Sequence, residues 1–178
     1  PERRAFLRSD LAETAELAAV VGQYAVAHPG VHFTFALNDR KRVSAGGAGS
    51  LRATMADLYG DDVARALLTV AADAVQPADD ADAAEEANWV RITGLISPPD
   101  LSRESRACIF ISVNGRPSRP GRHLSAILSE AYQTLLPHDR YPIVALHIAT
   151  PAWAVDVAGQ PGKTRVRFRD PAFVGRQI

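Results

Sequence analysis

The segment Gly159-Gln160-Pro161-Gly162-Lys163-Thr164 holds residue types that bind phosphate in many proteins. A phosphate loop needs a glycine, four further residues, and then Gly-Lys followed by Ser or Thr. Its backbone amides surround the phosphate, and a helix starts at the lysine. The position of the first glycine is Val157 here, and residues 164–169 alternate in polarity as a strand does. A Walker-type loop is therefore excluded. Lys163 remains of interest, because the chain has only one other lysine, Lys41.

Other nucleophiles and metal-binding residue types are too scattered to form an active site. His28 and His32 are four residues apart, but a Pro-Gly pair between them prevents a shared helix face. The single cysteine, Cys108, excludes an internal disulfide and a cysteine-rich zinc site, and buried packing explains it equally well. Ser112 and Ser118 lack a neighbouring base or a nucleophile elbow. We therefore expect no metal site, and no nucleotide hydrolysis by this chain alone.

Basic residues are concentrated in the second half of the chain. The net charge is zero, but residues 1–100 carry 9 basic and 15 acidic side chains, whereas residues 101–178 carry 11 and 5. Guanidinium groups bind phosphate through paired hydrogen bonds. Arg116, Arg119 and Arg122 are candidates for one basic surface that contacts a polyanion, and ordinary solvated arginines remain the alternative. The full group around Glu104 consists of Arg103, Arg106, Arg116, Arg119 and Arg122.

Apolar spacing predicts the elements that position these residues. Asp10 with Glu13 is typical of a helix start, and Leu17, Val20, Val21 and Tyr24 follow at helical spacing. Six acidic residues and Pro77 predict a solvated, mobile loop over 73–86, with some strand on either side. Because helices and strands mix without strict βαβ alternation, we expect an α+β fold with a mixed β-sheet backed by helices. The expected helices are 10–27, 51–58, a short one around 63–67, and 124–135; the expected strands are 31–37, 40–45, 89–96, 108–113, 143–148, 154–157 and 164–169. Asn38-Asp39 predicts a hairpin turn between the first two strands, and Asn114-Gly115 predicts a turn after 108–113.

The length of 178 residues, with 47% hydrophobic and 22% charged residues, fits one domain with a real core. No apolar run approaches eighteen residues and no basic-then-apolar leader is present, so we expect neither a membrane-spanning helix nor a signal peptide. Because the chain starts at Pro1, we expect it to be a fragment of a longer protein.

Several motifs, taken in order, resemble one known family. Phe110-Ile-Ser-Val-Asn-Gly-Arg116 is followed by a helix, then by Pro142-Ile-Val-Ala-Leu-His-Ile148, then by Val155-Asp-Val and by Pro161-Gly-Lys-Thr-Arg-Val-Arg-Phe168. At the other end, Pro1-Glu-Arg-Arg-Ala-Phe-Leu-Arg-Ser9 is similar to the family's P-A-R-x-K-F-L-K-S. The chain thus resembles the second, transducer domain of MutL-type DNA mismatch repair proteins over its whole length.

This resemblance implies a ribosomal protein S5 domain 2-like fold and a single domain over residues 1–178. It implies that the preceding GHKL ATPase domain and the C-terminal dimerisation domain lie outside the chain. The domain would couple ATP binding next to it to DNA binding, with Lys163 as the catalytic contact to the nucleotide phosphate and Arg116, Arg119 and Arg122 as the DNA-binding surface. ATP and Mg²⁺ would bind only to the full-length protein, and the chain alone would bind neither.

The same resemblance implies DNA, a mismatch-recognition protein and a second copy of the full-length protein as partners. It also implies a cytoplasmic, nucleoid-associated location without membrane contact. Two alternatives stay open. The family's N-V-H before the proline is Ala158-Gly159-Gln160 here, so the domain could be a protein-interaction module with a degenerate nucleotide-contact loop. It could also be the corresponding domain of another GHKL ATPase, such as a type II topoisomerase subunit.

Overall fold

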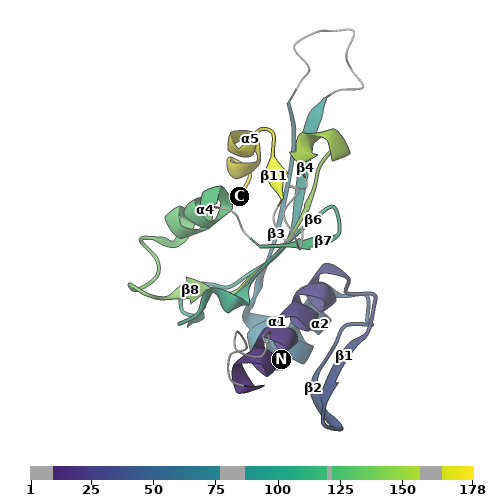
Figure 1. The fold of residues 1–178 in the computed structure, drawn as a ribbon. Helices are drawn as coiled ribbons and strands as arrows, with labels where there is room; N and C mark the ends of the chain where they lie inside the picture. Colours follow the sequence, from purple (N-terminus) through teal and green to yellow (C-terminus); the bar gives the residue numbers. More distant parts are fainter. Residues whose placement is uncertain (1–9, 77–86, 120–121, 157–165) are drawn as a thin grey trace, which may run out of the picture. The chain divides into compact units, whose positions relative to one another are not determined.

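The computed structural model describes residues 10–76, 87–119, 122–156 and 166–178, and the chain divides into two compact units, 1–65 and 66–178 (Figure 1). Each unit has its own secondary structure and is described by itself. The prediction that residues 1–178 form one domain stays a prediction.

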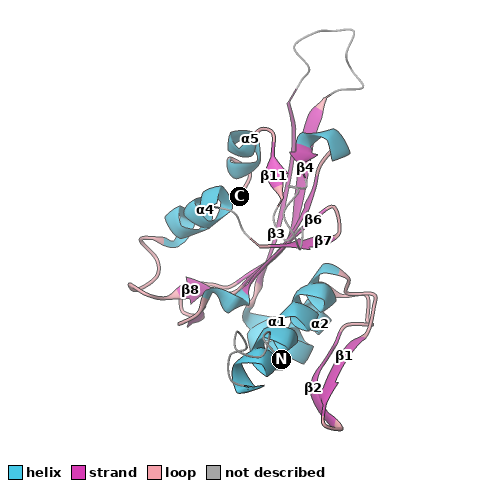
Figure 2. Cartoon of the chain, viewed as in Figure 1, coloured by secondary structure: helices cyan, strands magenta, loops and turns pink. Residues whose placement is uncertain are grey.

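The first unit contains helix α1 (Asp10–Ala27), the hairpin of β1 (Phe33–Leu37) and β2 (Arg40–Ala45), and helices α2 (Leu51–Tyr59) and α3 (Asp61–Ala66) (Figure 2). Asn38 and Asp39 both have positive φ, as the predicted two-residue hairpin turn requires. Gly46 also has a positive φ of 86°, and a Cβ there would lie 2.4 Å from the Val31 carbonyl oxygen, so only glycine fits the close approach. The helices and the hairpin predicted for this part of the chain are confirmed.

The apolar face predicted for α1 differs from the face that packs. Leu17, Val20 and Tyr24 are exposed, whereas Ala25 and Val26, near the end of the helix, are buried. Gly22 is also buried, and a Cβ there would lie at an ordinary contact distance, 3.7 Å, from the Leu58 side chain of α2. Helical spacing therefore predicted the helix correctly but does not identify its buried side.

The second unit is built on a five-stranded sheet in the order β3-β4-β9-β6-β7. Its strands are β3 (Leu68–Gln76), β4 (Asn88–Ile96), β6 (Ile109–Val113), β7 (Arg116–Ser118) and β9 (Val144–Ala149). Strands β6 and β9 run parallel, and the other neighbours run antiparallel. The predicted α+β class with a mixed sheet is confirmed.

Helices α4 (Arg122–Tyr132) and α5 (Pro171–Gly175) cover one face of this sheet (Figure 1). The core there joins Leu124 and Leu128 of α4, and Phe173 of α5, to alternate residues of the strands. Two short strand pairs complete the unit: β5 (Ser102–Arg103) with β8 (Tyr141–Pro142), and β10 (Val155–Asp156) with β11 (Arg167–Phe168). Two single turns of 3₁₀ helix, η3 (Arg106–Cys108) and η4 (Ala152–Ala154), precede β6 and β10.

Three predicted boundaries are corrected. Cys108 ends η3 and is buried, so the strand starts at Ile109. Ala154 belongs to η4, so the strand predicted from 154 starts at Val155. Asp73 lies inside β3, where its carboxylate pairs with the Arg91 guanidinium at 2.7 Å across the strands; the rest of the acidic segment, 77–86, lies outside the described residues. Among the described helices, none is long and apolar enough to cross a membrane.

Candidate functional site

The turn between β6 and β7 carries the first predicted DNA-contacting arginine. Asn114 and Gly115 both have positive φ, 48° and 75°, which gives a tight hairpin turn and places Arg116 at the start of β7. Arg116 and Arg119 are exposed. Arg122 is the first residue of α4, and its side chain lies outside the described part of the structure. The structure thus places Arg116 at the turn of this hairpin and Arg119 directly after β7, beyond its other end.

Asn114 fixes this turn against two other strands. Its side-chain amide donates to the Thr150 carbonyl at 3.0 Å, and its side-chain oxygen accepts from the Thr150 N–H at 3.0 Å. Its own backbone N–H donates to the Ile148 carbonyl at 2.8 Å. The Thr150 hydroxyl in turn donates to the Trp89 carbonyl at 2.9 Å. Asn114 therefore ties together the end of β6, the end of β9 and the start of β4.

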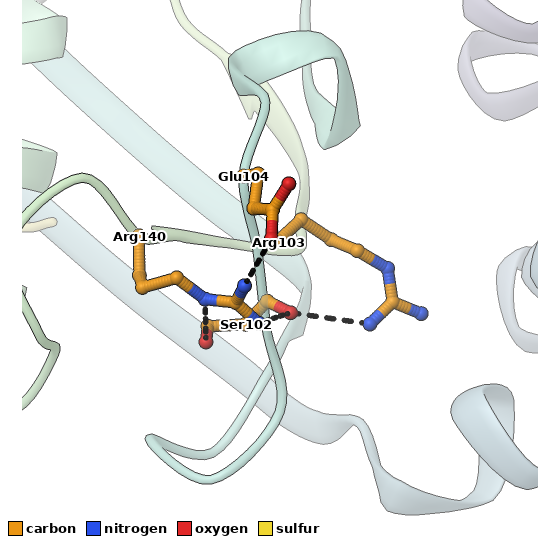
Figure 3. A network of polar contacts seen from close by, with 4 residues as sticks. All are labelled: Ser102, Arg103, Glu104 and Arg140. Carbon is orange, nitrogen blue, oxygen red and sulfur yellow. Dashed lines mark hydrogen bonds and ion pairs between the residues drawn. The ribbon is translucent and has the colours of Figure 1, made fainter.

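Arg103 and Arg106, which are near Arg116 in sequence, lie at the opposite end of β6. Figure 3 shows Arg140 at the centre of a polar network there: its Nε donates to the Ser102 Oγ at 3.0 Å, and one terminal nitrogen pairs with Glu104 at 3.2 Å. The Arg103 side chain donates to the Ser102 carbonyl at 3.2 Å. The Arg106 guanidinium lies 4.8 Å from the centre of the Tyr141 ring. The arginine group around Glu104 is thus split: Arg103 and Arg106 precede β6, whereas Arg116 and Arg119 follow it, and Glu104 pairs with Arg140.

A cleft of about 420 Å³ opens beside this network, between α4 and the segment that leads to β8. Tyr132 lies in its wall, and its hydroxyl donates to the Ser97 carbonyl at 2.7 Å. Burial raises the pKa of Tyr132 above its ordinary value of about 10, and the hydrogen bond to Ser97 opposes this shift. The Ser97 hydroxyl also accepts the Ile143 N–H at 3.0 Å, so Tyr132 anchors the end of α4 to the strands below it.

Lys163 lies outside the described residues, but strands β10 and β11 lie on either side of its segment in the sequence. Val155 pairs with Phe168, and Asp156 pairs with Arg167, so the residues before and after this segment lie side by side in β10 and β11. The Arg169 N–H donates to the Ala154 carbonyl at 2.9 Å, which extends this pairing. Val155 and Phe168 both pack against the core of the sheet. The described residues on either side of 157–165 are therefore packed on the same core as Val113, the residue before Asn114.

His147, Ser112 and Cys108, which the sequence offered as possible chemical groups, lie in or next to the buried part of the sheet. His147 is half-buried in β9, and Ser112 is buried in the neighbouring β6 at the paired position. Cys108 is buried, which agrees with its interpretation as packing. Within the described ranges, no three His, Cys, Asp or Glu side chains gather as a metal site.

Comparison with known proteins gives the family. A family model for the C-terminal domain of DNA mismatch repair proteins matches residues 55–178. The DNA mismatch repair protein MutL of Azorhizobium caulinodans is 39% identical over 175 residues, which cover 96% of this chain and 26% of that protein. The chain belongs to the MutL family of DNA mismatch repair proteins.

Further MutL relatives match at similar levels. Identity is 37% over 168 residues with MutL of Methanoculleus marisnigri, covering 94% of this chain and 26% of that protein. It is 35% over 178 residues with MutL of Geobacillus kaustophilus, covering 100% of this chain and 26% of that protein. The chain thus spans about a quarter of the length of these MutL proteins.

Solved structures agree with the fold. The N-terminal domain of a DNA repair protein superimposes with a TM-score of 0.76 at 21% identity, over 98% of this chain and 54% of that one. The Aquifex aeolicus MutL ATPase domain, complexed with ADP, superimposes with a TM-score of 0.50 at 16% identity, over 85% of this chain and 48% of that one. The predicted transducer-type fold and MutL membership are confirmed. The roles of Lys163, Arg116, Arg119 and Arg122 stay predictions.

Two functional features escaped the sequence analysis. The Asn-Gly pair of the V-N-G-R motif was interpreted as turn chemistry, although the Asn114 side chain also holds Thr150. Arg140 was not singled out at all, because its partners, Ser102 and Glu104, are more than thirty residues away in sequence. The Asn114-Gly115 pair, which is typical of a tight turn, is the one sequence signal that pointed to the first feature.

Proposed function

We propose that this chain is the transducer part of a MutL-type mismatch repair ATPase, coupling the nucleotide state of a neighbouring domain to DNA binding. One observation supports this most strongly. Strands β10 and β11, which flank the segment that carries Lys163, pack through Val155 and Phe168 against the core of the five-stranded sheet, and the turn before Arg116 joins β6 and β7 of that sheet. A contact made by Lys163 would therefore be passed to the arginine surface through packed strands.

In this proposal ATP and Mg²⁺ bind to the preceding GHKL domain of the full-length protein, and the Lys163 ammonium contacts the terminal phosphate. A compact ammonium on a flexible stem suits this role, because it stabilises negative charge that grows as phosphoryl transfer proceeds. The contact would also report the nucleotide state, since it exists only while the γ-phosphate is present. The ADP complex of the Aquifex aeolicus MutL ATPase domain supports a nucleotide role for this family.

The test of the nucleotide role is Lys163→Ala in the full-length protein. We expect ATP turnover to fall at least tenfold, about 1.4 kcal/mol of transition-state stabilisation, with the fold intact by circular dichroism. The matched control is Lys41→Ala, which removes the only other lysine from an exposed position of β2. Wild-type turnover in Lys163→Ala would instead favour a protein-interaction module whose loop no longer serves ATP.

The proposed DNA surface consists of Arg116, Arg119 and Arg122. Each neutralised phosphate contributes a log–log salt slope of about −0.9 on duplex DNA and about −0.7 on single strands, so three contacts give roughly −2 to −3. Reversal of Arg119 and Arg122 to glutamate should weaken binding to all sequences alike and flatten the slope. The control reversal is Arg42→Glu, an exposed arginine of the first unit. Unchanged affinity in the double reversal would remove the arginines from the proposed function.

The wider context belongs to the same proposal. In the full-length protein we infer a preceding ATPase domain, a C-terminal dimerisation domain that makes a homodimer, and a mismatch-recognition protein as partner. We also propose that the protein is cytoplasmic and associated with the nucleoid. Sedimentation of the full-length protein, with and without a non-hydrolysable ATP analogue, tests the homodimer directly.

A further inference from the structure

Both tryptophans of the chain are exposed at one end of the sheet. Trp89 is 39% exposed at the start of β4, and Trp153 is 42% exposed in η4. Val75, which pairs with Trp89 across β3 and β4, is 68% exposed. Large aromatic side chains bury surface when they can, and these two are the only tryptophans in the sequence. Their shared exposure therefore indicates a contact surface.

Hydrogen bonds bring the backbone at Trp89 close to the chain that leads into Trp153, and both close to the turn before Arg116. The Thr150 hydroxyl donates to the Trp89 carbonyl at 2.9 Å, and Trp153 follows three residues after Thr150 in the single turn of η4. Figure 1 shows this turn beside the first residues of β4. The Asn114 side chain holds Thr150 from the other side, and Arg116 comes two residues after Asn114.

Positive charge flanks the tryptophans on two sides. Arg116 is exposed at the start of β7, and Arg169 is exposed next to η4, where its N–H donates to the Ala154 carbonyl at 2.9 Å. The described acidic side chains nearby have partners of their own: Asp156 lies opposite Arg167, Asp170 accepts the Phe173 N–H at 2.8 Å, and Asp73 pairs with Arg91 at 2.7 Å. The acidic residues of 79–86 precede Trp89 in sequence and would repel phosphate. We therefore assign the phosphate contacts to Arg116 and Arg169.

We propose that Trp89 and Trp153 form a base-stacking surface for single-stranded DNA, with Arg116 and Arg169 contacting its phosphates. This inference rests on the proposed DNA-binding function and adds a preference to it. Unpaired bases present flat faces that stack on aromatic rings, whereas the bases of a duplex are already stacked on each other. The surface therefore discriminates single strands from duplex, which arginines on phosphates alone do not.

The experiment uses the tryptophan fluorescence of the 178-residue chain, because both tryptophans belong to the proposed surface. Titration with a dT oligonucleotide of about ten nucleotides should quench the emission. Trp89→Phe and Trp153→Phe leave one reporter each and should retain most of the affinity, since a phenyl ring still stacks. Trp153→Ala should weaken dT binding at least about fivefold while duplex binding stays unchanged. Leu135→Ala, which removes a 53% exposed apolar side chain of the same unit, is the matched control and should bind as wild type.

The outcomes separate this inference from the function on which it rests. If reversal of Arg119 and Arg122 abolishes DNA binding but Trp153→Ala and Trp89→Ala bind dT as wild type without quenching, the stacking surface is refuted and the DNA-binding function stands. If the chain binds neither single strands nor duplex, both fall. If the alanine variants keep full DNA affinity but lose self-association in sedimentation, the patch is a protein interface and the inference is wrong.

Discussion

Replacement of Asn114 tests whether its contacts to Thr150 stabilise the second unit. In Asn114→Ala the Thr150 N–H and carbonyl lose their side-chain partners at a position that is only 4% exposed. Two such hydrogen bonds are worth about 2 kcal/mol together, at about 1 kcal/mol each. Alanine also pays about 1–2 kcal/mol for the left-handed backbone, because φ is 48° at this position. We expect a total loss of about 3–4 kcal/mol in the free energy of unfolding.

Asn114→Gly separates the two contributions. Glycine adopts positive φ without strain, so this variant should lose only the hydrogen bonds, about 2 kcal/mol. Urea unfolding followed by tryptophan emission measures both variants, and it reports the second unit because residues 89 and 153 lie there. Equal losses for alanine and glycine would show that the turn is not strained. A loss below about 1 kcal/mol in both variants would refute the proposed tie between β6 and β9.

Three further predictions concern other parts of the second unit. Burial raises the pKa of Tyr132, so the unfolded chain releases the phenol proton at a lower pH than the folded chain. The free energy of unfolding should therefore fall as the pH rises above about 10. In Tyr132→Phe this fall should be smaller, as measured by urea midpoints between about pH 9 and 11. Gly94→Ala should destabilise by about 3 kcal/mol or more, since its Cβ would lie 2.1 Å from the Ala145 carbonyl oxygen; a wild-type melting temperature would contradict this packing. Arg140→Leu should lower the free energy of unfolding by about 1–3 kcal/mol. Glu104→Gln should lower it by less than about 0.5 kcal/mol, because the Glu104 side chain is 87% exposed. Equal losses of stability in thermal melts would show that the ion pair with Glu104 holds the network together.

The sequence predicted the parts of the fold that depend on local pattern. Strand β9 is a run of apolar residues buried on both faces, and the helix over 122–132 has a clear apolar stripe, so both were predicted close to their bounds. The hairpin at Asn38-Asp39 followed from turn chemistry alone. The order of strands in the sheet was not predictable from such patterns, because β9 inserts between β4 and β6 through pairings more than thirty residues apart.

The candidate site was predictable only in its chemistry. Arginines could be assigned to phosphate from residue type, but their grouping in sequence was misleading. Arg106 precedes β6 and Arg116 follows it, and because a strand is extended, residues at its two ends lie far apart. The exposure of Trp89 and Trp153 was equally invisible, since a tryptophan in a strand pattern is more often buried.

The arrangement of the second unit also limits how a signal can pass through it. Val155 and Phe168, which close the Lys163 segment, pack on the same buried cluster as Val113 and Ile148, next to the Asn114 turn. Close-packed cores transmit displacement and resist gradual deformation. Under the proposed function, we therefore expect a nucleotide contact at Lys163 to move the arginine turn and the tryptophans together, as one rigid body. A spin-label pair with one label at Arg169 and one at Arg116 should then keep a constant distance when ATP binds to the full-length protein. A change in that distance would mean that the signal instead passes by deformation of the sheet.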